Sequence, residues 1–170
     1  MSANEATSGV AAPLPYPDAD LRVHPPRSAR EQLAGLVFLP RTIDKVRAKL
    51  QGTLGIYKVT PGLSGYLFEW LGLTEDGFTA AVREATSDTD IAEYLRTHCN
   101  TTTFGEINRR LTERSIRDDD HFNEVLPRYP VLRAYPQLRN WFEIFEVDDR
   151  WSFDPANAEE VARAVNSDGG

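Results

Sequence analysis

LVFLPRTIDKVRAKLQGTLGIYKV, residues 36–59, is the stretch that decides the fold. Pro40 suits the first turn of a helix, because a backbone N–H at that position has no partner within the helix and proline has none to lose. Gly52 suits the end of a helix, where the last residue often adopts the left-handed conformation. Apolar residues recur between them at helical spacing, on one face: Leu39, Ile43, Val46 and Leu50. The pattern predicts a helix of about three turns that packs this face into the core.

The opposite face of this helix carries charge, because Arg41, Asp44 and Lys45 share it. Spacing alone predicts that this face is solvated, with Asp44 paired to Arg41 three residues earlier. Such a surface pair contributes only about 0.2–0.5 kcal/mol. On this interpretation the charges keep the helix soluble and have no further role.

Length and charge limit the class of protein. A chain of 170 residues is long enough for one domain with a real core. Its net charge of -7 argues against nonspecific binding to nucleic acid or to an anionic membrane. The single cysteine, Cys99, excludes an intrachain disulfide, and the first 20 residues lack the apolar run of a signal peptide. We therefore expect a cytoplasmic protein.

The rest of the chain predicts an all-α fold in one compact, multi-helix domain. We expect a disordered lead at 1–19, a helical domain at 20–153, an appended helix at 154–166 and a disordered tail at 167–170. At most a very short extended segment is expected, near Ile56–Val59. Ser28 with Glu31, and Ser87 with Asp90, have the spacing of capping boxes that start helices. Pro136 suits the first turn of the last core helix.

A family resemblance follows from several short motifs. They are Asp20-Leu21, Pro25-Pro26-Arg27-Ser28, LPRTIDKVRAKLQGTLGIY from Leu39, FEWLGL from Phe68, Ser87-Asp88, Ile107-Asn108-Arg109-Arg110, Trp141-Phe142 and Asp148-Asp149. Together they resemble the bacterial family called domain of unknown function 5069, over about residues 20–151. The resemblance implies a single, mostly helical, cytoplasmic domain, and no activity is settled for the family.

The resemblance also bears on the charged face of the central helix. The family signature retains residues that match Pro40-Arg41, Asp44-Lys45 and Tyr57. A merely solvated face would not need such a signature, so the resemblance implies that something covers or uses these charges. Two interpretations stay open, a buried structural charge network and a ligand or catalytic site.

These residues suggest one chemistry for a site. Arg41 has a planar fork that suits a carboxylate or phosphate, and Lys45 supplies a second cation one turn later. Asp44 is the candidate general base, and Tyr57 is the candidate donor to a developing oxyanion. We therefore expect a metal-independent site that binds a small anionic metabolite or performs acid/base catalysis. No phosphate loop or dinucleotide motif is present, so no cofactor is expected.

Two other kinds of site have candidate residues in the sequence. A partner protein would dock on the exposed side of residues 141–153, which makes the domain an interaction module with a structural charge network. A homo-oligomer is the other kind of partner that we consider. A metal site would use Asp118, Asp120, His121 and Glu124. No second histidine lies at ligand spacing there, so we expect no metal.

Overall fold

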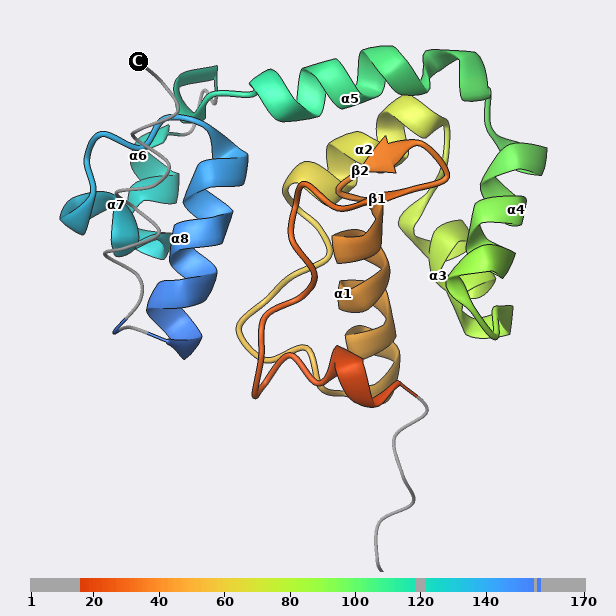
Figure 1. Ribbon diagram of the computed structural model, residues 1–170, viewed down its shortest axis with the longest axis horizontal. Coiled ribbons are helices and arrows are strands. Elements are labelled where there is room, and N and C mark those ends of the chain that lie inside the picture. Colours follow the sequence, from red (N-terminus) through yellow and green to blue (C-terminus); the bar gives the residue numbers. More distant parts are fainter. Residues whose placement is uncertain (1–15, 119–121, 155, 157–170) are drawn as a thin grey trace, which may run out of the picture.

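Helix α1, Leu39–Gln51, runs through the centre of the molecule and the other helices surround it (Figure 1). The computed structural model describes residues 16–118, 122–154 and 156. Helices α3 and α4 lie on one side of α1 and α6 to α8 on the other, α2 lies across the upper end of α1, and α5 crosses above. The helices that follow α1 are α2 Leu63–Leu71, α3 Glu75–Glu84, α4 Asp88–His98, α5 Phe104–Glu113, α6 Phe122–Val125, α7 Val131–Ala134 and α8 Trp141–Phe153. Short 3-10 helices occur at Pro17–Ala19, Thr101–Thr103, Ile116–Asp118 and Leu126–Arg128.

The sequence signals at both ends of α1 are where they were expected. Pro40 lies in the first turn, and Gly52 ends the helix in the left-handed conformation, with φ 74°. The residue before the helix, Phe38, also has a positive φ, 66°, which is rare for a bulky side chain. Its ring is fully buried and stacks on Phe142 of α8 at a centroid distance of 5.7 Å. This packing holds the backbone of Phe38 in a strained conformation.

The all-α prediction is confirmed, but the short extended segment is not at Ile56–Val59, where residues 55–56 form a turn. In the described part of the chain, the sheet is the antiparallel pair of β1, Gln32–Leu33, and β2, Leu36–Val37. Ala34 and Gly35 join these strands with φ of 54° and 85°. Positive φ at both central residues is the geometry of a type I′ hairpin turn.

Two expected helix starts are wrong. The Ser28–Glu31 capping box does not start a helix, because this segment is a turn and the N–H of Phe38 bonds to the carbonyl of Ala29 at 3.0 Å. Helix α8 starts at Trp141 and not at Pro136. The side chain of its N-cap, Asn140, accepts a hydrogen bond of 2.8 Å from the N–H of Phe142.

The ordered domain begins earlier than residue 20. Ala19 is buried, and the hydroxyl of Tyr16 donates to the carbonyl of Ala85 at 3.2 Å. Residues 16–19 therefore pack with the helical domain and do not belong to the lead. The predicted helix at 154–166, except for residues 154 and 156, and the tail at 167–170 lie outside the described residues. Within the described ranges, no helix has the length and apolar character needed to cross a bilayer.

Candidate functional site

The charged face of α1 is buried. Relative exposure is 4% for Arg41, 6% for Asp44 and 7% for Lys45. The interpretation of this face as solvated is therefore wrong, and so is the expected pair between Arg41 and Asp44. Each of the two binds a partner elsewhere in the chain. Periodicity failed here because other segments of the chain cover both faces of the helix.

Arg41 is held by a carboxylate from the last described helix. Its Nη1 and Nη2 donate to Asp149 Oδ2 and Oδ1 at 2.7 and 3.1 Å, so the pair is bidentate. The hydroxyl of Tyr57 donates to the same Oδ1 at 2.7 Å. Phe145 and Tyr57 lie against the guanidinium, with ring centroids 5.1 and 5.6 Å from its central carbon. The fork of Arg41 is thus filled from within the protein.

Lys45 lies beside this pair without a carboxylate of its own. Its ammonium makes no hydrogen bond or ion pair with the described residues, and lies 5.2 Å from the ring centroid of Phe38. Burial, together with the charge of Arg41, lowers the pKa of Lys45 to about 7. Burial also raises the pKa of Asp148 to about 6, and the neighbouring charge of Asp149 adds to this effect. Each of these groups is therefore partly in its neutral form near neutral pH.

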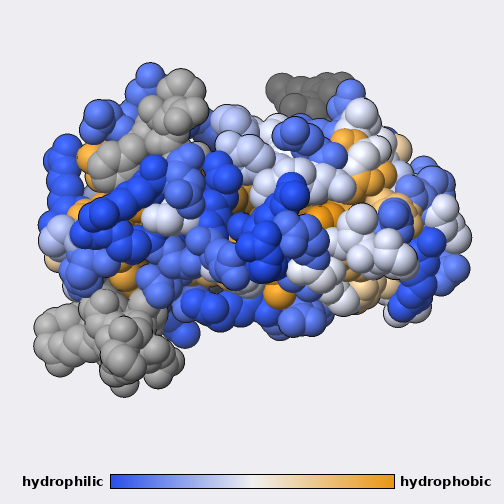
Figure 2. All heavy atoms as spheres, turned by 90° about the horizontal axis from the view of Figure 1, so that it is seen from above, coloured by the Kyte–Doolittle hydropathy of each residue, from blue (hydrophilic) through white to orange (hydrophobic). Residues whose placement is uncertain are grey.

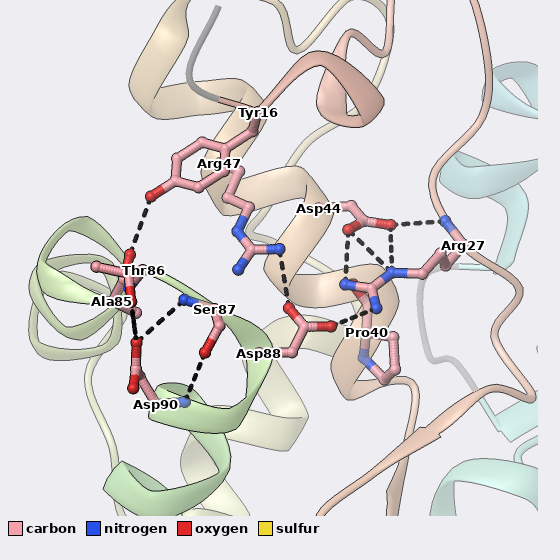
Figure 3. Close-up of polar contacts among 10 residues, drawn as sticks. All are labelled: Tyr16, Arg27, Pro40, Asp44, Arg47, Ala85, Thr86, Ser87, Asp88 and Asp90. Atoms are coloured by element: carbon pink, nitrogen blue, oxygen red, sulfur yellow. Dashed lines mark hydrogen bonds and ion pairs between the residues drawn. The ribbon is translucent and has the colours of Figure 1, made fainter.

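Asp44 belongs to a different group of charges, which Figure 3 shows. Arg27 donates its backbone N–H to Oδ2 of Asp44 at 2.8 Å, and its Nη2 to Oδ1 at 2.8 Å. Arg27 Nε lies 3.1 and 3.0 Å from Oδ1 and Oδ2. Arg27 Nη1 then reaches Asp88, at the start of α4, at 2.6 Å. These bonds tie the segment before β1 to α1 and to α4.

Arg47 completes this group from the next turn of α1. Its Nη1 forms an ion pair with Asp88 Oδ1 at 2.8 Å, and its guanidinium carbon lies 4.7 Å from the ring centroid of Tyr16 (Figure 3). Arg47 Nε is buried and has no hydrogen-bond partner, and Asp88 Oδ1 is buried with the ion pair to Arg47 as its contact. Buried polar atoms of this kind are uncommon in folded proteins and need an explanation.

A cleft of about 470 Å³ opens at this group, and we call it the charged cleft. Its lining is mostly polar, and comprises Tyr16, Asp18, His24, Pro25, Arg27, Asp44, Arg47, Thr86, Ser87 and Asp88. Binding sites for small molecules have volumes of about 300–1,000 Å³, so the cleft has a suitable size. It can offer both hydrogen-bond donors and acceptors to one ligand.

The structure thus divides the predicted site residues. Arg41, Lys45 and Tyr57 lie around Asp149, whereas Asp44 lies in the charged cleft, and no hydrogen bond joins Asp44 to Tyr57. Burial and the charge of Asp149 raise the pKa of Tyr57. Spacing along α1 missed the partners of these residues. The resemblance did contain them, in the motifs Arg27-Ser28, Ser87-Asp88 and Asp148-Asp149.

Helix α8, where a partner was expected to dock, packs one side into the core, and docking on its exposed side stays a prediction. The large apolar residues at the start of α8, Trp141, Phe142 and Ile144, are buried in the core, whereas Trp151 is 39% exposed. The face that Figure 2 shows is mostly hydrophilic, and its hydrophobic residues form small, separate patches. Asp120 and His121 lie outside the described residues. Among the residues that are described, no three His, Cys, Asp or Glu side chains gather as they would around a metal ion.

Comparison with known proteins gives one positive finding. No curated protein matches the chain. A family model described as "Domain of unknown function (DUF5069)" matches residues 23–151, which include α1, both charge groups and most of α8. This match confirms the resemblance found in the sequence, and the chain belongs to this family of unknown function.

Proposed function

We propose that this domain binds a small molecule in the charged cleft, with a carboxylate or similar anionic group of the ligand on Arg47. The observation that carries the proposal is the unused hydrogen-bonding capacity of Arg47. Its Nη1 is engaged by Asp88, whereas its buried Nε has no partner. Leaving such a donor unsatisfied costs about 1–3 kcal/mol, and a ligand that accepts from it recovers part of this.

The cleft is a better site than the group around Arg41. Both terminal nitrogens of Arg41 already bind Asp149, so an anionic ligand would have to displace an internal carboxylate. Arg47 meets an internal carboxylate through one nitrogen and lines a cleft of ligand size. The anionic metabolite that the sequence suggested for Arg41 and Lys45 is therefore assigned to Arg47.

Metal-independent binding is proposed here in preference to acid/base catalysis. A general base needs a lone pair within reach of the proton that it removes. Asp44 directs both of its oxygens to Arg27, and each oxygen accepts from two nitrogens of that residue. Asp44 thus acts as an anchor for Arg27, which in turn positions Asp88 at the wall of the cleft.

The proposal is tested by screening the purified full-length chain against a metabolite panel by thermal shift, followed by calorimetric titration of each hit. Arg47→Gln should weaken the binding of a carboxylate ligand about ten- to a hundredfold, because a charge-assisted hydrogen bond is lost. The matched control is Arg96→Gln, which removes an exposed arginine that pairs with Glu93. A chain that binds nothing in the panel, or hits that bind Arg47→Gln as well as the parent, would refute the proposal.

A second candidate function, an interaction module, has one observation in its favour. Val23 and Ile56 are 68% and 69% exposed, and they lie on neighbouring loops, because Gly55 packs against the backbone of Leu21 and Arg22. A partner protein or a second copy of the chain would cover them. Sedimentation velocity over a range of concentrations tests the second copy, and a monomer at all concentrations excludes it. The cytoplasmic location stays a prediction that rests on the sequence.

A further inference from the structure

We propose that the ligand of the charged cleft is a zwitterion that carries a carboxylate and an ammonium group, as α-amino acids do. This inference rests on the proposed function and names its ligand class. It follows from the balance of charge in the lining, from the Nε of Arg47 and from the carboxylate of Asp18, which makes no ion pair with the described residues.

The charge of the lining disfavours a simple anion. The cleft has two cationic side chains, Arg27 and Arg47, and three carboxylates, Asp18, Asp44 and Asp88, which gives a formal charge of -1. A monoanion would raise this to -2 in a partly desolvated place, where repulsion between like charges is stronger than in water. A zwitterion leaves the charge at -1, and its ammonium group offsets the carboxylate that it brings.

The carboxylate end of such a ligand fits Arg47. Because Nη1 is paired with Asp88, Nε and Nη2 are left, and these two nitrogens form the side-on fork that binds a carboxylate through both oxygens. The ring of Tyr16 lies on the guanidinium and limits its rotation. The fork is thus held in place before the ligand arrives, which lowers the entropic cost of binding.

The ammonium end fits the carboxylates of the same cleft. Asp18 lies on the 3-10 helix Pro17–Ala19, is exposed and has no ion pair or hydrogen bond with the described residues. Asp88 meets Arg27 at Oδ2 and Arg47 at Oδ1, and each of these oxygens has one further lone pair that can accept from an ammonium group. An ammonium group has three donors, so it can use both carboxylates. Arg27 already saturates Asp44, which is therefore not needed for this contact.

The test uses calorimetric titration of the full-length chain with the common L-amino acids. Each amino acid that binds is compared with its deaminated acid and its decarboxylated amine. We expect both analogues to bind about ten- to a hundredfold more weakly, because each loses one charged contact. A deaminated acid that binds as tightly as its amino acid overturns the zwitterion and leaves the proposed function in place. If other carboxylates bind and no amino acid binds, the zwitterion is likewise refuted and the proposed function stands.

Asp18→Asn is the variant that separates a role in binding from a role in folding, because the Asp18 side chain makes no hydrogen bond or ion pair with the described residues. It should weaken the binding of the amino acid by up to about fivefold, as the loss of an exposed charge pair does, and leave the binding of the deaminated acid unchanged. The matched control is Asp76→Asn, on the exposed first turn of α3. Equal weakening of both ligands, or of neither, overturns the assignment of the ammonium group. Failure of every ligand in the wider panel refutes the proposed function itself.

Discussion

Replacing Asp149 by asparagine is the sharpest test of the charges on α1. The substitution keeps the shape of the side chain and removes the negative charge that faces Arg41. Arg41 is 4% exposed, so its guanidinium cannot turn to bulk water without a rearrangement of α8. The reasoning predicts that the fold depends on this carboxylate.

The size of the effect follows from the contacts. Asp149 accepts two bonds from Arg41 and one from Tyr57, and its own side chain is 12% exposed. Removing one partner of a buried ion pair costs about 3–5 kcal/mol, because the other charge stays buried without compensation. For a domain of this length each kcal/mol lowers Tm by about 2–4 °C, so Asp149→Asn should lower Tm by about 6–20 °C.

Urea unfolding followed by circular dichroism measures this loss. The control is Glu113→Gln, which removes a carboxylate that pairs with Arg109 at 2.9 Å but is 62% exposed, and it should cost less than about 1 kcal/mol. The double replacement Arg41→Met with Asp149→Leu should recover most of the stability, since it removes both charges together. If Asp149→Asn costs no more than the control, the pair is not structural and the reasoning fails.

Three further predictions concern single residues. The pKa of Lys45 is about 7 in the folded protein and 10.5 for the free side chain. Between pH 7 and pH 10.5 the unfolded chain therefore binds one more proton than the folded protein, so the free energy of unfolding rises with pH. Lys45→Met should flatten this rise, as urea unfolding at several pH values will measure. The pKa of the Asp148 carboxyl is about 6 in the folded protein and 3.8 for the free side chain. Between pH 3.8 and pH 6 the folded protein therefore binds one more proton than the unfolded chain, and this carboxylate destabilises the fold once the pH exceeds 6. Asp148→Asn should raise Tm above pH 6 and lose this advantage near pH 4. Gly55→Ala should lower the free energy of unfolding by about 1–3 kcal/mol, because φ at residue 55 is 62° and a Cβ would lie 2.7 Å from the carbonyl oxygen of Leu21. Gly105→Ala is the control and should not destabilise the protein, because no atom lies near the position of its Cβ. Thermal denaturation measures both.

Local signals in the sequence predicted local structure well. Pro40 and Gly52 mark the ends of α1, and the capping box of Ser87 with Asp90 is present at the start of α4. Both signals act within a few residues, so nothing distant is needed to satisfy them. The same capping spacing failed at Ser28, where a long-range bond between Phe38 and Ala29 fixes the backbone instead. Tertiary contacts decide such cases, and a short motif does not contain them.

The site was harder to predict because its partners are distant in sequence. Helical spacing reports only which residues share a face, whereas Arg41 and Asp149 are 108 positions apart. Asp44 is 17 positions from Arg27. The family resemblance did show that the charges on α1 had a role. It left open which groups cover them, and a single sequence has no physical rule that pairs charges over such separations.

The pairing of Arg41 with Asp149 also has a consequence for biosynthesis. The ribosome synthesises α1 before α8, so the guanidinium of Arg41 lacks its native partner until residue 149 has emerged. Contacts over such sequence distances form late, because closing a long loop costs entropy first. The nascent chain must therefore keep the charged side of α1 hydrated during most of its synthesis. A transcript truncated before residue 149 would yield a product that cannot complete its core and becomes a substrate for chaperones and proteases.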